Sequence, residues 1–266
     1  MKPSLGFIGC GQMAQALLGG FSRHSDMLGK ILLYDMEAEK SLALSERYGG
    51  EVSSSGPELT READLILLAV KPTQVPSVLE KITPAIHESK LIISVAAGVS
   101  ISDIHRVTGE HVPVVRVMPN VPCLIGHGVM GVSFSSGVPE YRRRLILDLF
   151  STVGQVELIP EQHMDGVTAV SGSGPAFIFL VAEAMTDAAV DIGLPRDLAR
   201  RLVEQTLVGS SLMLQQGDEH PAVLRERVTS PGGTTIAGLR ALESGGLRSA
   251  FFNAIMAAYQ RSAKRN

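Results

Sequence analysis

The sequence has no tryptophan, and aromatic residues make up only 5% of its 266 residues. It has only two cysteines, Cys10 and Cys123, and neither lies in a C-x-x-C pair. A disulfide framework or a cysteine-based zinc site is therefore not expected. None of the seven histidines has the spacing typical of metal ligands, so no metal is expected. These absences favour a reduced, cytoplasmic protein.

An excess of charge of one sign and long apolar runs are also missing. The sequence has 24 basic and 27 acidic residues, and a net charge of −3 gives no reason to expect nucleic acid or an anionic membrane as a partner. The one basic run, Arg142–Arg144, has Glu140 nearby and is typical of a solvated helix face. The first residues lack the apolar segment of a signal peptide, and we expect no stretch of roughly 18 residues that crosses a bilayer.

The chain consists of two unlike parts, which we assign to residues 1–160 and 161–266. Short apolar runs alternate with helical periodicity in the first part, which predicts a parallel sheet with helical crossovers. After Pro160 only helices are expected. We predict strands at 5–8, 31–34, 65–70, 91–95, 114–118, 128–134 and 155–158, separated by helices at 12–22, 37–48, 74–82, 101–107 and 142–150. Further helices are expected at 162–169, 175–192, 196–215, 220–228, 234–243 and 247–263.

One helical segment, Ala176–Ile192, is apolar around most of its circumference. Its charged residues Glu183, Asp187 and Asp191 are spaced four apart and form a single narrow stripe. A helix that is apolar on most sides must be buried on most sides. A helical part of this size can hardly surround the segment alone, so we predict that a second subunit covers it. The alternative is the central core helix of a monomer.

A glycine-rich turn follows the first predicted strand and opens a helix, with the pattern G-x-G-x-x-A at Gly9, Gly11 and Ala14. The first glycine permits a tight turn, the second lets the backbone approach a pyrophosphate, and the alanine keeps helix and strand close. Gln12 and Met13 complete the turn. In this strand–helix context the pattern predicts a dinucleotide site.

Asp35 follows the second predicted strand, where a carboxylate favours the ribose hydroxyls of NAD and repels the 2′-phosphate of NADP. It could equally be a surface residue that begins the next helix. Three further turns follow later strands, at the edge where such sheets bind ligands, and each could be structural instead. They contribute Ala69, Val70, Lys71 and Pro72, then Ala96, Ala97 and Gly98, and finally Asn120 between two prolines.

A second motif, Ser230-Pro231-Gly232-Gly233, opens a predicted helix and is followed by Thr234 and Thr235. The two glycines let successive N–H groups point to one spot, and a helix N-terminus there binds a carboxylate or phosphate. The two hydroxyls can bond to whatever carries that anion. The alternative is an ordinary capped helix start.

Considered together, these residues resemble the Δ1-pyrroline-5-carboxylate reductase family, whose members catalyse the last step of proline biosynthesis. The resemblance extends over nearly the whole chain, and its last two motifs in this order and spacing are typical of that family and of little else. It rests on residues 9–14, 69–72, 96–98, 118–120, 171–176 and 230–248.

The resemblance implies an α/β fold, a Rossmann-type doubly wound and mostly parallel sheet followed by an all-α dimerisation domain. It implies homo-oligomers built from interlocked dimers, often decamers. It further implies that hydride from NADPH or NADH reduces the cyclic imine 1-pyrroline-5-carboxylate. The pocket in this family joins one subunit's Rossmann domain to its partner's helical domain.

By motif position, the resemblance implies that the substrate carboxylate binds the N–H groups of Gly233 and Thr234. The Thr235 hydroxyl would act as the catalytic group beside the ring nitrogen, with Ser230 and Gly232 in the same pocket. Glu161 matches a substrate contact at the start of the helical part.

Asp35 departs from the family pattern, because many members carry a small polar or basic residue there and use NADP. Two other functions stay open on the residues alone. One is a hydroxy-acid dehydrogenase, against which the absence of lysine from 162–192 counts. The other is a dinucleotide sensor without catalysis.

Overall fold

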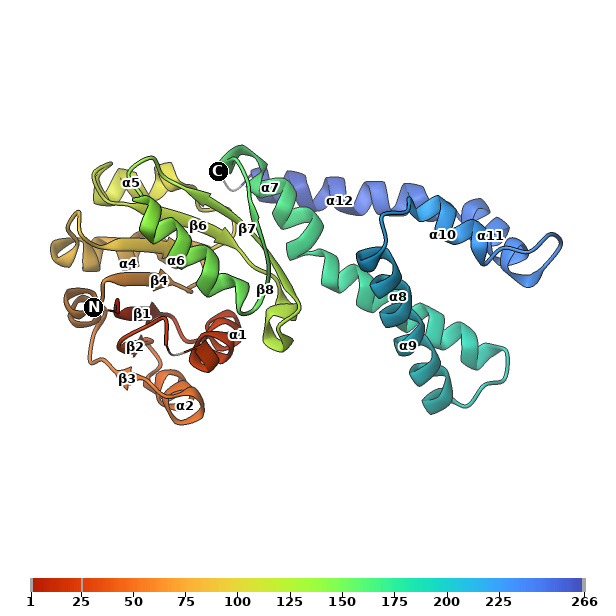
Figure 1. Cartoon of the computed structure of the whole chain (residues 1–266), viewed down its shortest axis with the longest axis horizontal. Coiled ribbons are helices and arrows are strands. Elements are labelled where there is room, and N and C mark those ends of the chain that lie inside the picture. The colour runs from red at the N-terminus through yellow and green to blue at the C-terminus, as the bar shows by residue number, and fades with distance from the viewer. Residues whose placement is uncertain (1, 25, 265–266) are drawn as a thin grey trace. The chain divides into compact units, whose positions relative to one another are not determined.

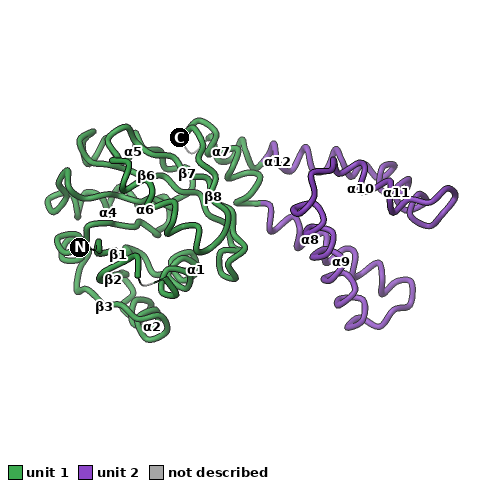
Figure 2. Tube along the Cα trace, viewed as in Figure 1, with its two compact units in different colours: residues 1–173, 258–266 green, residues 174–257 purple. Residues whose placement is uncertain are grey.

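The structure is a computed structural model that describes residues 2–24 and 26–264. The chain forms two compact units, which Figure 2 shows in different colours. The first unit comprises Met1–Ser173 and Ala258–Asn266, and the second comprises Gly174–Ala257. The domain boundary that the sequence predicts at residue 160 stays a prediction. Of the two predicted domains, 1–160 and 161–266, residues 1, 25 and 265–266 lie outside the described residues.

The first unit is built on an eight-stranded sheet with the strand order β3-β2-β1-β4-β5-β6-β7-β8 (Figure 1). β1 to β6 run parallel, β7 is antiparallel to β6, and β8 is parallel to β7. The order of the first six strands is that of a doubly wound dinucleotide-binding sheet, which confirms the predicted fold class. The strands are β1 Leu5–Ile8, β2 Ile31–Tyr34, β3 Glu51–Val52, β4 Leu65–Leu68, β5 Leu91–Ser94, β6 Val114–Met118, β7 Gly128–Phe134 and β8 Gly154–Leu158.

Alternate residues of the central strands belong to two separate hydrophobic clusters, one on each face of the sheet. In β4, Leu65 and Leu67 belong to the cluster that includes Phe21 and Phe150, whereas Ile66 belongs to the other. A strand that is apolar on both faces has no amphipathic alternation, and this explains why such strands read as continuous apolar runs. Helices α1 Gln12–Phe21, α2 Ala38–Tyr48 and α6 Glu140–Ser151 pack on one face, and α3 Gly56–Glu62, α4 Val75–Ile82 and α5 Ile101–Thr108 on the other.

Two elements were not anticipated, the strand β3 and the helix α3. Both residues of β3 are exposed at the sheet edge, so the strand has no buried face that would mark it in the sequence. The helix α3 is short and polar, and begins where the Ser55 hydroxyl accepts a hydrogen bond from the Glu58 N–H (3.3 Å). Short 3₁₀ turns lie at Ser22–His24, Pro72–Gln74, Thr83–Ala85, Val121–Ile125 and Glu161–His163.

The segment predicted as one helix over 162–169 is instead composite. The short helix α7, Met164–Val167, leads into a π-helical turn at Thr168–Gly172. The Ser173 N–H donates to the Thr168 carbonyl (2.9 Å), five residues back. Such turns insert one extra residue into a helical path and occur frequently at functional sites.

The second unit is entirely helical, as expected for the second half of the chain. It contains α8 Gly174–Asp191, α9 Arg196–Gln216, α10 Pro221–Arg227 and α11 Thr234–Ser244, and α12 Leu247–Ala263 begins in it. Within residues 174–257, all of which the structure describes, only Ala199 and Val203 are buried. The unit therefore has almost no core of its own.

The helix α8 shows this most clearly, because none of its residues is buried in the single chain. Phe179 is 64% exposed and Leu180 63% exposed.

The expectation that no stretch is apolar and long enough to span a membrane was wrong. Glu161–Asp191 meets that criterion by length and composition, and only 6% of its most apolar window is buried. In the sequence this stretch is not one uninterrupted apolar run, because small and polar residues divide it. In the structure α7, the π turn and α8 follow one another without a break and form one long helical segment.

Candidate cofactor and substrate site

The glycine turn after β1 lies between the ends of β2 and β4, where the strand order reverses. The Gly9 N–H donates to the Tyr34 carbonyl (2.8 Å), and the Ala69 N–H donates to the Ile8 carbonyl (2.8 Å). Gly9 has φ +98°, and a Cβ there would lie 2.7 Å from the Ala69 carbonyl carbon. Only glycine fits this position, both for conformation and for space.

Gly11 is different, because the protein itself leaves its side-chain position open. A Cβ there would meet nothing within 4 Å. Gly11 is the N-cap of α1, no side chain caps the helix, and no acidic residue lies in its first turn. The N–H groups of this first turn have no intrahelical acceptor and are suited to an anion. Ala14 is fully buried, as close helix–strand packing requires.

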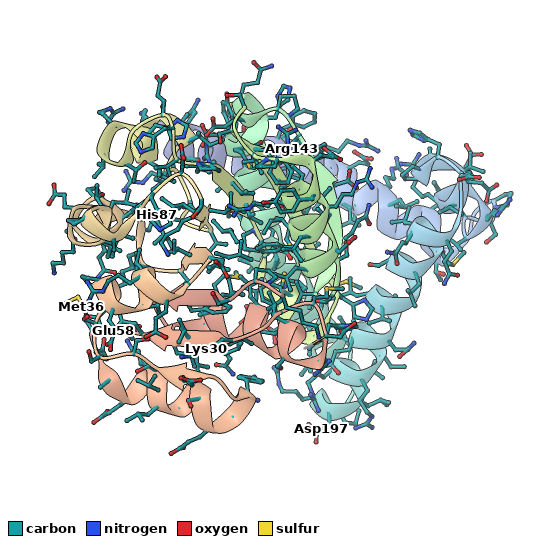
Figure 3. All side chains as sticks on the ribbon, turned by 60° about the vertical axis from the view of Figure 1, so that its left-hand side comes forward. Lys30, Met36, Glu58, His87, Arg143 and Asp197 are labelled. Atoms are coloured by element: carbon teal, nitrogen blue, oxygen red, sulfur yellow. The ribbon has the colours of Figure 1, made fainter. Side chains whose placement is uncertain are left out.

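Asp35 braces the glycine turn from the end of β2. Its Oδ2 accepts from the Cys10 N–H (2.7 Å) and its Oδ1 from the Glu37 N–H (2.9 Å). Burial, with a further contribution from the Asp35 carboxylate, raises the pKa of the Cys10 thiol to about 12, so this cysteine stays protonated. Met36, labelled in Figure 3, follows Asp35 and is exposed.

The turns after β4 and β5 lie at the same edge of the sheet. Ala69 and Val70 are half-buried, and Lys71 is exposed where the Pro72–Gln74 turn begins. Gly98 has φ +71°, and a cavity of about 910 Å³ is bordered by Lys71, Pro72 and Gly98. Ala96 is buried and Ala97 half-buried. The strand order thus brings the predicted cofactor residues from β1, β2, β4 and β5 together.

Asn120 is 7% exposed, and both ends of its amide bond to the backbone. Its Nδ2 donates to the Ser171 carbonyl in the π turn (3.2 Å), and its Oδ1 accepts from the Val129 N–H (3.0 Å). The amide therefore holds the turn after β6 in place. Its contact with a cofactor ring stays a prediction.

Sequence reasoning gave no role to Arg116, a buried arginine on β6. Its Nη1 lies 3.2 Å from Glu161 Oε1 and its Nη2 lies 3.9 Å from Asp165 Oδ1. Glu161 Oε1 also accepts from the Ile101 N–H (2.6 Å). A single arginine inside the apolar strand Val-Val-Arg-Val-Met is the signal that would have found this cluster, because a buried charge needs a partner.

The Ser230–Thr235 turn lies in the second unit. Gly232 has φ +68°, and the Gly233 N–H donates to the Ser230 carbonyl (3.1 Å). Gly233 is the N-cap of α11 without a side-chain cap, and a Cβ on it would collide with the Ser230 hydroxyl. Thr234 is exposed and Thr235 half-buried. The local geometry is thus that of a helix N-terminus with N–H groups suited to an anion and two hydroxyls beside them.

Two family models match the chain. One, described as pyrroline-5-carboxylate reductase dimerisation, covers residues 161–265. The other, described as NADP oxidoreductase, coenzyme F420-dependent, covers residues 4–98. The first model contains the Ser230–Thr235 turn, and the second contains the glycine turn, Asp35 and the turns after β4 and β5.

Similar proteins cover the chain almost completely. It is 38% identical over 265 residues to pyrroline-5-carboxylate reductase of Escherichia coli, which covers 99% of this chain and 98% of the relative. It is 39% identical over 259 residues to the enzyme of that name in Pisum sativum, covering 97% and 94%. The crystal structure of Plasmodium falciparum pyrroline carboxylate reductase with NADP bound superposes with a TM-score of 0.90 at 35% identity, covering 99% and 98%.

Proposed function

The chain belongs to the pyrroline-5-carboxylate reductase family, and we propose that it reduces 1-pyrroline-5-carboxylate to L-proline with hydride from NADPH or NADH. It is an oxidoreductase with a Rossmann-type fold. The observation that carries the proposal is full-length similarity to these reductases, combined with a glycine turn whose second glycine faces open space. In the reaction the imine carbon gains a hydride, and the nitrogen ends with the proton that makes it an amine.

The residues of the first unit fit a dinucleotide. Gly11 would let the backbone approach the pyrophosphate, with the first-turn N–H groups of α1, including those of Gln12 and Met13, as donors. Ala69–Pro72 would lie along the adjacent ribose and diphosphate, and Ala96–Gly98 would leave space for the nicotinamide ring, which supplies the hydride. Asp35 is at the position that contacts the ribose hydroxyls in such sheets.

The Ser230–Thr235 turn is the proposed substrate site. The N–H groups of Gly233 and Thr234 would bind the substrate carboxylate, and Gly232 and Ser230 shape the turn. Thr235 would orient the ring nitrogen through its hydroxyl. A threonine hydroxyl does not ionise near neutral pH, and a protonated imine already accepts hydride well, so Thr235 acts by hydrogen bonding and not as a strong acid.

We propose that the functional form is a homodimer in which each site combines the first unit of one subunit with the Ser230–Thr235 turn of its partner. Support comes from the second unit, which has almost no core and exposes Phe179 and Leu180 on α8. Apolar surface of this kind marks an interface. A second copy also accounts for the membrane-like composition of Glu161–Asp191 without a membrane. Interlocked dimers and a decamer of them remain part of this proposal, as does the cytoplasmic location.

Replacing Phe179 by glutamate is expected to convert the dimer to monomer at micromolar concentration, because the new carboxylate would be buried without a partner. Size-exclusion chromatography with light scattering measures the change. Leu42→Glu is the matched control: Leu42 is 51% exposed on α2 of the first unit, and this variant should stay dimeric. If the Phe179→Glu and Leu42→Glu variants had the same molecular mass in solution, this result would contradict the proposed interface.

Replacing Asp35 by serine is expected to raise the NADPH/NADH ratio of kcat/KM by about 10- to 100-fold, because a carboxylate that repels the 2′-phosphate is removed. Since Asp35 also accepts from the Cys10 N–H, Asp35→Asn is the matched variant: it removes the charge and keeps an acceptor oxygen. The NADPH/NADH ratio of kcat/KM is measured for each variant from initial rates with each cofactor. Unchanged ratios in both variants would leave Asp35 only as a brace for the turn.

The proposed reaction is tested by the initial rates of NADH and NADPH oxidation with 1-pyrroline-5-carboxylate, at matched concentrations. We expect turnover with at least one cofactor and proline as the product. No turnover from folded protein that still binds a dinucleotide would overturn the reductase proposal. A hydroxy-acid dehydrogenase or a non-catalytic sensor would then be the remaining functions.

A further inference from the structure

The turn after β5 is held from two directions, and one of them is distant in sequence. At its far end Ser100 and Asp103 form a capping box at the start of α5, with Ser100 N–H to Asp103 Oδ2 at 2.9 Å and Asp103 N–H to Ser100 Oγ at 3.0 Å. The first residue of α5, Ile101, instead donates its N–H to Glu161 Oε1 (2.6 Å). The residues between β5 and this hydrogen bond include Ala96, Ala97 and Gly98.

The Glu161 carboxylate is itself fixed by Arg116. Arg116 has only 6% of its side chain exposed, and its Nη1 contacts the same oxygen that Ile101 uses (3.2 Å). A second carboxylate, Asp165, lies 3.9 Å from Nη2 and accepts from the Ser262 hydroxyl (2.7 Å). A buried guanidinium between two carboxylates leaves each little freedom to move, because separating either pair strands a charge.

This arrangement joins two parts of the chain that are distant in sequence. Glu161 is the first residue of the segment 161–265 that matches the dimerisation family model, and Ile101 directly follows the 96–100 turn, which contains the predicted cofactor residues. Glu161 Oε1 is occupied by these two donors, which leaves its other oxygen for any substrate contact. A carboxylate at the N-terminus of α5 is also favoured by the helix dipole. The capping box sets where α5 begins, and the bond from Ile101 to Glu161 ties this start, and with it the end of the 96–100 turn, to Glu161.

We propose that Arg116 and Glu161 are positioning residues that hold the 96–100 turn in the conformation that receives the nicotinamide end of the dinucleotide. The inference rests on the proposed function, since it assumes that this turn faces the nicotinamide. Glu161 acts on the turn through the Ile101 N–H, and Arg116 acts through Glu161. Neither residue needs to touch the cofactor.

The test measures binding of the reduced dinucleotide in the absence of imine, by titration of nicotinamide fluorescence. NADPH or NADH is used, whichever the unaltered protein binds more tightly. A truncated probe that lacks nicotinamide, 2′-phospho-ADP-ribose or ADP-ribose respectively, is titrated by competition. Glu161→Asp keeps the charge but shortens the side chain by one methylene, so its oxygen withdraws from Ile101. Glu161→Gln keeps the length and an acceptor oxygen.

We expect Glu161→Asp and Glu161→Ala to weaken binding of the full dinucleotide by about 5- to 20-fold, the effect of losing one charge-assisted hydrogen bond. Glu161→Gln should stay within about 3-fold, because the amide oxygen still accepts from Ile101. Arg116→Lys keeps the buried charge but not the planar fork, and should fall between these variants. Affinity for the truncated probe should change by less than about 2-fold in every variant, since the 96–100 turn does not reach that half.

Thermal unfolding identifies any variant that fails to fold, and the comparison of Glu161→Asp with Glu161→Gln does not need the alanine variant. Equal weakening of both probes would show a general structural role and overturn the proposal. Unchanged dinucleotide binding with a raised KM for the imine would make Glu161 a substrate contact instead. If the unaltered protein bound neither dinucleotide, the proposed function itself would be overturned. This outcome differs from the variant results above, which test only the positioning role of Arg116 and Glu161.

Discussion

Substitution of valine for Gly11 is expected to weaken dinucleotide binding by about 100-fold or more while leaving the melting temperature unchanged. A fall of this size, more than about 2.7 kcal/mol, corresponds to losing several charge-assisted hydrogen bonds between a pyrophosphate and backbone N–H groups. The fold tolerates the change, because a Cβ on Gly11 meets no protein atom within 4 Å. Its φ of −79° and ψ of −169° suit any residue. The valine methyl groups would fill the space that the pyrophosphate needs.

Two further glycines serve as controls for this experiment. Gly137, in the turn before α6, also has nothing within 4 Å of its Cβ position, so Gly137→Val should alter neither binding nor stability. Gly9→Ala should instead lower the melting temperature, because Gly9 has φ +98° and a Cβ there would lie 2.7 Å from the Ala69 backbone. Fluorescence titration and thermal unfolding measure the two quantities separately. Normal dinucleotide affinity in Gly11→Val would show that the turn is not the cofactor site.

The second large effect is expected at Thr235, where replacement by alanine should lower kcat by about 10- to 1000-fold. This is the range for removing one placed polar contact from a transition state. The hydroxyl is proposed to orient the ring nitrogen as it becomes an amine, so its loss acts on the chemical step more than on cofactor affinity. Steady-state rates at saturating cofactor, with the imine varied, give kcat and KM.

Thr235→Ser is the matched variant, since it keeps the hydroxyl and removes only the methyl group. It should retain a rate within about 5-fold of the unaltered enzyme, because serine has the same donor and acceptor capacity. Both variants should bind NADPH or NADH as before, which excludes a general loss of structure. Near-normal turnover of Thr235→Ala would remove Thr235 from the mechanism and leave the N–H groups of the turn as the only proposed substrate contacts.

Those parts of the molecule whose residues are neighbours in sequence could be predicted before the structure was known. The glycine turn is one, because Gly9 needs a positive φ and Gly11 an open approach within three residues of each other. The central strands of the sheet are a second example, since a strand that is buried on both faces has a continuous apolar run in its sequence. The strand β3 escaped prediction because both of its residues are exposed. The helix α3 escaped because it has seven residues and Leu59 is its only buried apolar side chain, which gives no apolar period to recognise.

The sequence by itself determined the fold class and the conformation of the glycine turn, and it predicted that a second copy covers α8. Each of these follows from local periodicity, local backbone conformation or the composition of one helix. Only the tertiary structure decided how the turns are held. Asp35 braces Cys10 across 25 positions, and Glu161 joins Ile101 and Arg116 across 60 and 45 positions. Hydrogen bonds over such separations leave no periodic pattern in the sequence, because the strand order and the turns and helices that follow the strands bring their donors and acceptors together.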